Sequence, residues 1–364
     1  MSADFTSTPT LVKLAILGFG NVGRAFAEQI TQRRNWLKDA FGMEVQIVGV
    51  ADRSGAVIDR SMLDVAALAQ LKRAGGQLAG AAGGSSASPS EIIERFAEAG
   101  AQIVIETLPS NLQSEGEPAI TLVTEALTRG WHVVTANKAV LLFAGPKLER
   151  LAADGNVHFA HSGATCAALP TLSFARRELV GAEITGIRGI LNGTTNYILT
   201  RMNEEGLSFE AALAAAQAAG IAEPDPRYDI EGWDSAAKLL ILANALMESE
   251  AGFGDVARSG IDTIPPRLIE EARAAGGALK LIAEAKRKDG RKDGRKDGRV
   301  ELSVAPNIVL PTDSLFAVRG SNKAIEFHTD LYGTLLVAGG ASSRLAVAAT
   351  LLKDVIHAAR FTHR

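Results

Sequence analysis

Residues 13–23 read Lys-Leu-Ala-Ile-Leu-Gly-Phe-Gly-Asn-Val-Gly, an apolar run that leads into three closely spaced glycines. The apolar residues 14–17 predict a buried strand, and residues 22–33 predict the helix that follows it. A strand, a Gly-x-Gly-x-x-Gly turn and a helix in this order are typical of dinucleotide-binding folds. The alternative is a tight strand-to-helix turn that binds no ligand.

Each glycine of this turn has its own expected role. Gly18 allows the tight turn, Gly20 lets the backbone approach a pyrophosphate, and Gly23 lets the helix pack closely on the strand. The amino end of the helix then faces the phosphates. We predict that the cofactor contacts Gly18, Phe19, Gly20, Asn21, Val22 and Gly23.

Asp52 and Arg53 follow a second predicted strand, 45–51, at the place where a carboxylate binds the adenosine ribose. A polar insert at 34–42 lengthens the usual spacing. Asp52 would repel the 2′-phosphate of NADP, whereas Arg53 and Ser54 could bind it. The residues therefore leave NAD and NADP open, with a slight preference for NAD.

The first half of the chain alternates short β-rich runs with helical patterns, which predicts a doubly wound parallel sheet. Further strands are expected at 103–106, 132–135 and 157–159, and helices at 118–128 and 147–153. The Gly/Ala/Ser-rich segment 75–88 predicts a mobile surface loop.

The second half has a different pattern, beginning near Ala160. Strands are expected at 184–191, 279–285 and 300–304, and helices from Asn196, Phe209 and Trp233. The overall expectation is an α/β fold with two domains. Residues 1–155 form a Rossmann-type domain, which a C-terminal helix within 341–364 completes by docking on a sheet. Residues 156–340 form an α+β substrate-binding and dimerisation domain.

Composition narrows the class of protein. With 364 residues, of which 47% are hydrophobic, the chain is long enough for two domains. Its 38 basic and 41 acidic residues are spread along the chain, so we expect a small-molecule partner and no nucleic acid. One cysteine, Cys166, excludes an intramolecular disulfide and fits a reducing compartment. The N-terminal MSADFTSTPT and the absence of a long apolar run predict a cytoplasmic protein without membrane segments.

A Lys-Asp-Gly-Arg tetrapeptide repeats three times between Lys288 and Arg299. Because Asp-Gly favours tight hairpin turns, we interpret the repeat as a lengthened β-hairpin tip. A basic strip that binds anions is the alternative, although each period also carries an acid.

Two segments follow later strands of the first domain, at the sheet edge where ligands collect. They are 106–110, with Thr107 and Pro109 as predicted cofactor contacts, and 135–138, which ends in Lys138. A lysine here is either an ordinary surface residue or a group directed at the nicotinamide.

In the second domain, residues 189–196 join a strand to a helix and place the N–H groups of Gly193 and Thr194 at the helix start. Such a site can bind a carboxylate. The alternative is simple capping by Asn192, Thr194 or Thr195.

Glu223 begins a Glu-Pro-Asp-Pro-Arg segment that two prolines should hold extended. Asp234 and Lys238 then lie four residues apart on a predicted helix and can pair. The pair is either a solvated salt bridge or, since apolar residues 239–243 follow, a buried pair that needs a role.

Together these segments resemble the homoserine dehydrogenase family. The matching elements are residues 18–23, Thr-Ala-Asn-Lys at 135–138, Gly-Ile-Leu-Asn-Gly-Thr-Thr-Asn-Tyr-Ile-Leu at 189–199 and Ala-Gly-Ile-Ala-Glu-Pro-Asp-Pro at 219–226, with Asp229, Asp234 and Lys238 at the family's spacing. The resemblance implies reversible hydride transfer between NAD or NADP and the C4 carbon of aspartate 4-semialdehyde, giving homoserine. It also implies a homodimer formed through the sheet of the second domain.

The resemblance also assigns roles. Glu223 and the carbonyl of Thr194 would bind the substrate ammonium, whereas Lys238 and the N–H of Gly193 would hold the carboxylate. Asp234 and Lys138 would meet the reacting oxygen, with Lys138 or Lys238 as the general acid. Asp229 is a further predicted substrate-binding residue.

Two positions depart from the family pattern. His161 stands where the family has a glutamate that helps bind a monovalent cation, so we expect no metal and no stimulation by sodium. Residues 339–344 are less glycine-rich than their family counterpart. A dehydrogenase of a related small amino acid or semialdehyde is therefore the alternative. A non-catalytic dinucleotide sensor is disfavoured, because the acidic and lysine residues are all present.

Overall fold

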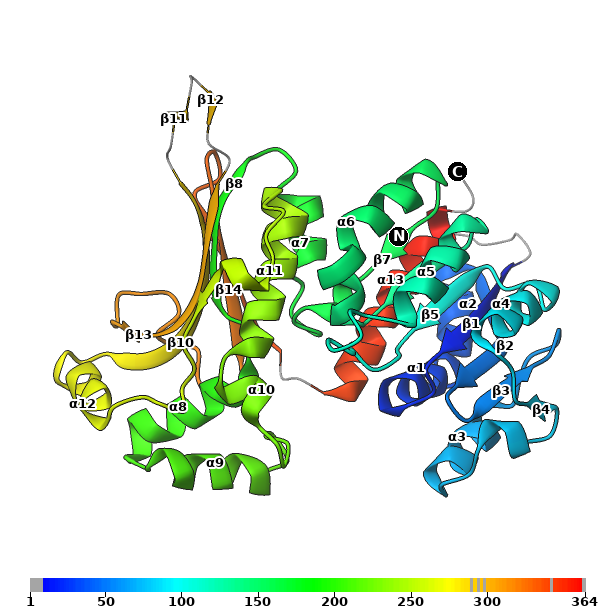
Figure 1. Ribbon diagram of the computed structural model, residues 1–364, viewed down its shortest axis with the longest axis horizontal. Coiled ribbons are helices and arrows are strands. Elements are labelled where there is room, and N and C mark those ends of the chain that lie inside the picture. Colours follow the sequence, from blue (N-terminus) through cyan, green and yellow to red (C-terminus); the bar gives the residue numbers. More distant parts are fainter. Residues whose placement is uncertain (1–8, 289–290, 293–294, 297–298, 341–342, 362–364) are drawn as a thin grey trace. The chain divides into compact units, whose positions relative to one another are not determined.

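The computed structural model describes residues 9–288, 291–292, 295–296, 299–340 and 343–361. The chain divides into two compact units, which Figure 1 shows. The first unit contains residues 1–164 and 343–364, and the second contains residues 165–342.

The first unit is built on a seven-stranded sheet with the order β4-β3-β2-β1-β5-β6-β7. Strands β2, β1, β5, β6 and β7 run parallel, and β3 and β4 are added antiparallel at one edge. The strands are β1 (Thr10–Leu17), β2 (Met43–Asp52), β3 (Gly55–Ile58), β4 (Gly84–Ser85), β5 (Ile103–Glu106), β6 (His132–Thr135) and β7 (Phe159–Ala160). The predicted Rossmann-type parallel sheet is confirmed.

Helices connect these strands and cover the sheet (Figure 1). They are α1 (Asn21–Gln32), α2 (Arg34–Phe41), α3 (Val65–Arg73), α4 (Pro89–Glu98), α5 (Ala119–Thr128), α6 (Lys138–Asp154) and α13 (Arg344–Phe361), with short 3-10 turns at Leu78–Gly80 and Ser162–Ala164. Helix α13 returns from the far end of the chain to pack on the sheet of the first unit, as expected from its apolar face.

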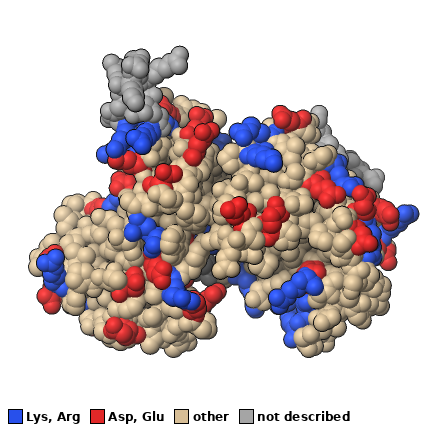
Figure 2. Space-filling view, in the orientation of Figure 1, with Lys and Arg blue, Asp and Glu red and all other residues tan. Residues whose placement is uncertain are grey.

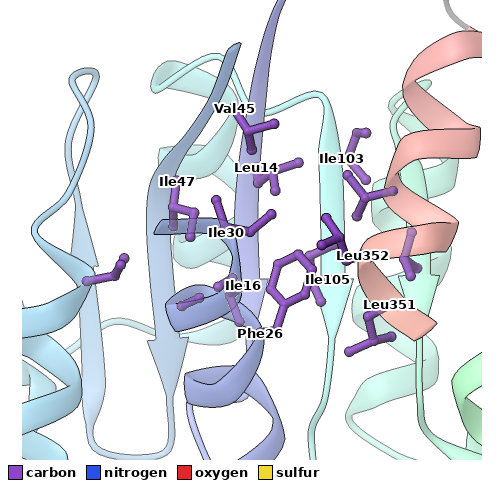
Figure 3. Close-up of a cluster of buried hydrophobic side chains, with 14 of the residues drawn as sticks. Leu14, Ile16, Phe26, Ile30, Val45, Ile47, Ile103, Ile105, Leu351 and Leu352 are labelled. Carbon is purple, nitrogen blue, oxygen red and sulfur yellow. The ribbon is translucent and has the colours of Figure 1, made fainter. Parts of the chain in front are cut away.

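The core of the first unit contains side chains of the sheet and of helices α1 and α13. Figure 3 shows Leu14 and Ile16 of β1 beside Phe26 of α1, and Leu351 and Leu352 of α13 beside the neighbouring strand β5. Each of these five side chains is buried. Burying a leucine or phenylalanine stabilises a fold by about 1.5–3 kcal/mol, so α13 contributes directly to the stability of this unit.

The polar insert that lengthens the spacing before Asp52 forms helix α2, which Gly42 caps in the left-handed conformation (φ 63°). Two local predictions for the first unit were wrong. The segment 75–88 is not simply a loop, because Leu78 is fully buried and β4 pairs with β3. Helix α6 begins at Lys138 rather than Lys147 and carries Pro146 inside it.

The second unit has a six-stranded sheet with the order β15-β14-β8-β10-β13-β9, antiparallel except for the β13–β9 pair. Its strands are β8 (Ile184–Ile190), β9 (Val256–Arg258), β10 (Ala278–Arg287), β13 (Val300–Val309), β14 (Lys323–Thr329) and β15 (Thr334–Gly339). Its helices are α7 (Leu172–Glu178), α8 (Gly193–Glu205), α9 (Phe209–Ala218), α10 (Arg227–Ile230), α11 (Trp233–Met247) and α12 (Pro266–Ala274), with a 3-10 turn at Phe253–Asp255. The predicted second α+β sheet is confirmed.

The repeat between Lys288 and Arg299 extends the hairpin formed by β10 and β13. The two short strands β11 (Arg291–Lys292) and β12 (Arg295–Lys296) pair antiparallel, as a lengthened hairpin requires. The three Asp-Gly pairs at 289–290, 293–294 and 297–298 lie outside the described residues.

Acidic and basic side chains are interspersed on the face of the molecule that Figure 2 shows. Among the helices that the structure describes, none combines the length and the apolar character needed to cross a bilayer.

Candidate active site

The glycine turn between β1 and α1 has the geometry of a phosphate cradle. Gly18 has φ 95°, and a Cβ there would lie 2.5 Å from the carbonyl carbon of Thr107. A Cβ at Gly23 would lie 2.1 Å from the carbonyl oxygen of Gly18, so the close approach of α1 to the turn requires glycine. Gly20 has no atom within 4 Å of its Cβ position. The backbone of Gly20, next to the first N–H groups of α1, is therefore open to the approach of a ligand, as the predicted pyrophosphate site requires.

The other residues of this turn have different surroundings. Phe19 is fully buried in the core of the first unit. The side chain of Asn21 accepts a hydrogen bond from Arg24 (2.9 Å). Val22 is half-buried and packs against the same core. These three residues shape the turn with their side chains, so contact with a cofactor would come chiefly from their backbone.

Asp52 ends strand β2 and is held by two neighbours. Lys72 of α3 lies 2.8 Å from one carboxylate oxygen, and Ser54 donates to the other from its N–H (2.7 Å) and its hydroxyl (2.5 Å). Burial raises the pKa of Asp52, but the hydrogen bonds from Lys72 and Ser54 outweigh burial and lower it. Arg53 is exposed. The adenosine end of the expected site thus contains an ionised aspartate beside a lysine that the sequence did not indicate.

Glu106, at the end of β5, joins the two segments predicted to face the nicotinamide. Its fully buried carboxyl accepts hydrogen bonds from the N–H of Leu108 (2.8 Å), the hydroxyl of Thr135 (2.5 Å) and the side chain of Asn137 (3.1 Å). Burial raises its pKa to about 7 against the lowering effect of these bonds. Sequence reasoning gave Glu106 no role of its own.

Lys138 lies at the first position of α6, directly after this cluster. Its backbone N–H donates to the hydroxyl of Ser110 (3.0 Å), and Asn137 caps the helix by accepting from the N–H of Ala139 (3.0 Å). Thr107 donates to the carbonyl of Gly18 (2.6 Å) and so connects this cluster to the glycine turn, whereas Pro109 is exposed. The structure brings Gly18, Thr107 and Lys138 to one edge of the sheet.

A connected polar cluster lies in the second unit, where α8, α10 and α11 meet. The Nζ of Lys238 lies 2.5 Å from Oδ2 of Asp234 and 2.9 Å from the carbonyl oxygen of Leu191. Asn192 donates to both Asp229 (2.6 Å) and Asp234 (2.8 Å). The pair of Asp234 and Lys238 is buried, so the solvated salt bridge is the wrong interpretation.

The carboxylate of Asp234 affects the ionisation of Asp229. Burial raises the pKa of Asp229, and the charge of Asp234 raises it further. Burial also raises the pKa of Tyr228, which the charges of Asp234 and Lys238 influence in opposite directions. The sequence indicated Asn192 only as a helix cap, and the side chain does accept a hydrogen bond from the N–H of Thr195 (2.8 Å). Its second role, as the donor that connects Asp229 to Asp234, was not predicted.

Gly193 and Thr194 begin α8 beside this cluster. A Cβ at Gly193 would lie 2.7 Å from the carbonyl oxygen of Ser321, so glycine is required at this position. The hydroxyl of Thr194 donates to the carbonyl of Ile221 (3.2 Å) and ties α8 to the segment before Glu223.

Glu223 itself is exposed and has no hydrogen bond or ion pair with Asp229, Asp234 or Lys238 among the described contacts. Its segment is not simply extended, because Pro226 has helical backbone angles (φ −88°, ψ 0°). The side chain of Gln217 holds the carbonyls of Glu223 (3.3 Å) and Pro224 (3.4 Å) instead.

His161, in the loop that departs from the family pattern, is buried against Glu149, with Nε2 and Oε1 2.8 Å apart. Within the described ranges, the structure contains no group of three His, Cys, Asp or Glu side chains placed to hold a metal. The expected absence of sodium stimulation stays a prediction.

Comparison with known proteins identifies the family. Residues 18–162 match the model of the homoserine dehydrogenase NAD-binding domain, and residues 170–356 match the homoserine dehydrogenase model. The chain belongs to the homoserine dehydrogenase family. An NAD(+)-dependent homoserine dehydrogenase of Pseudomonas canavaninivorans is 38% identical over 350 residues, which are 96% of each chain.

Solved structures of this family agree in fold. A protein from Archaeoglobus fulgidus that carries the family name is 32% identical, with a TM-score of 0.81 over 95% of this chain and 98% of its own. A hyperthermophilic archaeal homoserine dehydrogenase mutant in complex with NADPH is 26% identical, with a TM-score of 0.78 over 96% of this chain and 98% of its own. The predicted NAD(P)-dependent oxidoreductase activity of a homoserine dehydrogenase is confirmed, and the alternative amino-acid substrate is not favoured.

Proposed function

We propose that the buried pair of Asp234 and Lys238 is the proton-handling centre of this homoserine dehydrogenase. One observation carries this assignment: in the described part of the chain, Lys238 uses two of its three N–H donors, toward Asp234 and Leu191. The third donor is available to a ligand. An ammonium held this way stabilises an alkoxide and exchanges a proton with it.

The substrate would lie over the carbonyl end of β8. Lys238 and the N–H of Gly193 bind its carboxylate or its reacting oxygen, and Asp234 keeps Lys238 in place. Asp229 and the carbonyl of Thr194 face the substrate ammonium together with Glu223. Lys138 is assigned to the reacting oxygen by the family resemblance, as the second candidate for the general acid.

The first unit would hold NAD or NADP on the turn at Gly18–Gly23. The nicotinamide supplies the hydride acceptor for homoserine oxidation and the donor for the reverse reaction. In this proposal Asp52 binds the ribose hydroxyls, and Lys72, 2.8 Å from its carboxylate, offsets its charge when a 2′-phosphate is present. Thr107 and Pro109 follow β5 at the edge where the nicotinamide is expected.

Residues 1–155, with the helix in 341–364, are therefore proposed as the cofactor domain, and residues 156–340 as the substrate domain. The reaction is reversible: L-homoserine and the oxidised nicotinamide give aspartate 4-semialdehyde, the reduced nicotinamide and a proton. The direct test is nicotinamide reduction by purified protein in the presence of L-homoserine.

We also propose that the protein is a cytoplasmic homodimer joined through the sheet of the second unit. Supporting the dimer, strand β15 lies at the edge of this sheet and exposes Leu336, and the preceding turn exposes Leu331 and Tyr332. Exposed apolar side chains near an open strand edge are typical of subunit interfaces. Light scattering of the wild-type protein and of Leu336→Glu tests the dimer, and cell fractionation tests the location.

A further inference from the structure

Lys323, the first residue of β14, is a buried cation that the proposed chemistry does not use. Its residue exposure is 1%, and its Nζ donates to the carbonyl oxygen of Cys166 at 2.9 Å. Removing an ammonium from water costs several kcal/mol unless hydrogen bonds and nearby anions compensate. A lysine retained in such a place therefore requires a physical reason.

The surroundings of Lys323 lead to the proposed proton-handling pair. The thiol of Cys166 lies 4.0 Å from the carbonyl oxygen of Leu191, which also accepts the hydrogen bond from Lys238. Lys323 thus holds the backbone of Cys166. The side chain of Cys166 contacts the Leu191 carbonyl, which also accepts the hydrogen bond from Lys238. The connection runs through two contacts within the second unit.

Charge connects the groups as well. Burial lowers the pKa of Lys323, Cys166 raises it, Lys238 lowers it further and Asp234 raises it. The charges of this pair also act on Asp229 and Tyr228 of α10. Lys323 acts on the same cluster from the first position of β14.

We propose that Lys323 is a positioning residue for Asp234 and Lys238. As a cation it attracts the carboxylate of Asp234 and repels a like charge at Lys238, the group proposed to exchange a proton with the substrate hydroxyl. Its hydrogen bond to Cys166 supports the Leu191 carbonyl that orients Lys238. This inference rests on the proposed role of Lys238 as the group that exchanges the proton.

The same unit offers a matched control. Lys280 of β10 is also buried, at 2% exposure, and its Nζ donates to the carbonyl of Val318 (2.6 Å) and to Asn196 (3.1 Å). Burial lowers its pKa to about 8. The charged groups that act on it are Glu204 and Arg319, which are not members of the Asp234 and Lys238 cluster.

The experiment compares the pH dependence of kcat/KM for L-homoserine oxidation in the wild-type protein and in Lys323→Gln, Lys323→Arg and Lys280→Gln. Glutamine at position 323 loses the charge but can still donate a hydrogen bond. We expect Lys323→Gln to move the acid limb of the profile to higher pH by roughly half a unit or more, because a like charge near Lys238 is lost. Lys323→Arg and Lys280→Gln should keep the wild-type limb.

A folded Lys323→Gln protein with the wild-type profile would overturn the proposal, as would an equal shift in Lys280→Gln. Thermal unfolding checks that each variant is folded, and Lys323→Met replaces Lys323→Gln if the latter is not. Lys238→Ala is measured in parallel. If Lys238→Ala retains wild-type turnover, the proposed role of Lys238 fails. If Lys238→Ala is inactive, but the folded Lys323→Gln or Lys323→Met protein has the wild-type pH profile, only the role of Lys323 fails.

Discussion

Lys238 and Asp234 form a buried pair across one turn of α11, with Nζ and Oδ2 2.5 Å apart. Burial removes the water that weakens surface salt bridges, so the two groups keep a fixed geometry. The carbonyl of Leu191 takes a second donor of Lys238. This arrangement leaves a lysine that is oriented by the protein and able to contact a bound molecule.

Replacing Lys238 by alanine removes that donor and leaves Asp234 without its cation. We expect Lys238→Ala to lower kcat well over tenfold, and Lys138→Ala to do the same if it also meets the reacting oxygen. The lysines Lys286 of β10 and Lys147 of α6 are matched controls on the same two units, and their alanine variants should behave like the wild type. Unchanged turnover in Lys238→Ala or Lys138→Ala would remove that residue from the site.

Glu223 is expected to act on binding. Its exposed carboxylate would attract the substrate ammonium, so Glu223→Ala should raise KM for L-homoserine severalfold with a smaller effect on kcat. Asp225, two residues later, is the control because its carboxylate is already paired with Arg227 (2.6 Å) and Arg227 lowers its pKa to about 2. Equal effects of Glu223→Ala and Asp225→Ala on KM would argue against a specific contact.

Lys72 should influence the choice of cofactor. Without it, the carboxylate of Asp52 is left uncompensated and repels a 2′-phosphate. Lys72→Ala is therefore expected to weaken NADPH binding about tenfold, a loss of about 1.4 kcal/mol, and NADH binding much less. Fluorescence titration with each reduced cofactor measures this difference, with the neighbouring Arg73→Ala as control. A similar loss for both cofactors would show that Lys72 supports the fold rather than the phosphate.

Glu106 predicts a pH dependence of stability. Its carboxyl has a pKa of about 7 in the folded protein, above the ordinary value of 4.5. Protonation therefore stabilises the fold fully below about pH 4.5, and this contribution is lost as the pH rises through about 7. Glutamine resembles the protonated acid at every pH. Between pH 5 and 8 the free energy of unfolding of Glu106→Gln should therefore fall less than that of the wild type, with a difference on the order of 2 kcal/mol.

Urea unfolding at several pH values measures this effect. The exposed Glu98 provides the control, since Glu98→Gln should follow the wild-type curve. Parallel curves for the wild type and Glu106→Gln would mean that Glu106 is ionised throughout and that its hydrogen bonds outweigh its burial.

Much of this fold could be predicted because its parallel strands are rich in apolar residues. Ile103–Glu106 and His132–Thr135 have the predicted bounds, since the apolar residues inside each strand mark it as buried on both faces, although Glu106, His132 and Thr135 at the strand ends are polar. The start of helix α6 was predicted wrongly, because a proline such as Pro146 normally interrupts a helix. Here Pro146 lies inside a 17-residue helix.

The site could be predicted only in part, for a different reason. Asp234 and Lys238 lie on one helix, so their spacing alone brings them together. Lys72, Glu106, Asn192 and Lys323 act on residues from other strands and helices, and no sequence spacing encodes those contacts. Their roles became visible only from the distances between elements and from their burial.

The central claim is tested most directly by the initial rate of nicotinamide reduction with purified protein and L-homoserine, measured with NAD and NADP separately at alkaline pH, where oxidation is favoured. The account predicts saturable turnover with at least one cofactor and its loss in Lys238→Ala. Absence of turnover in folded protein that still binds the cofactor would contradict it and would point to a different substrate.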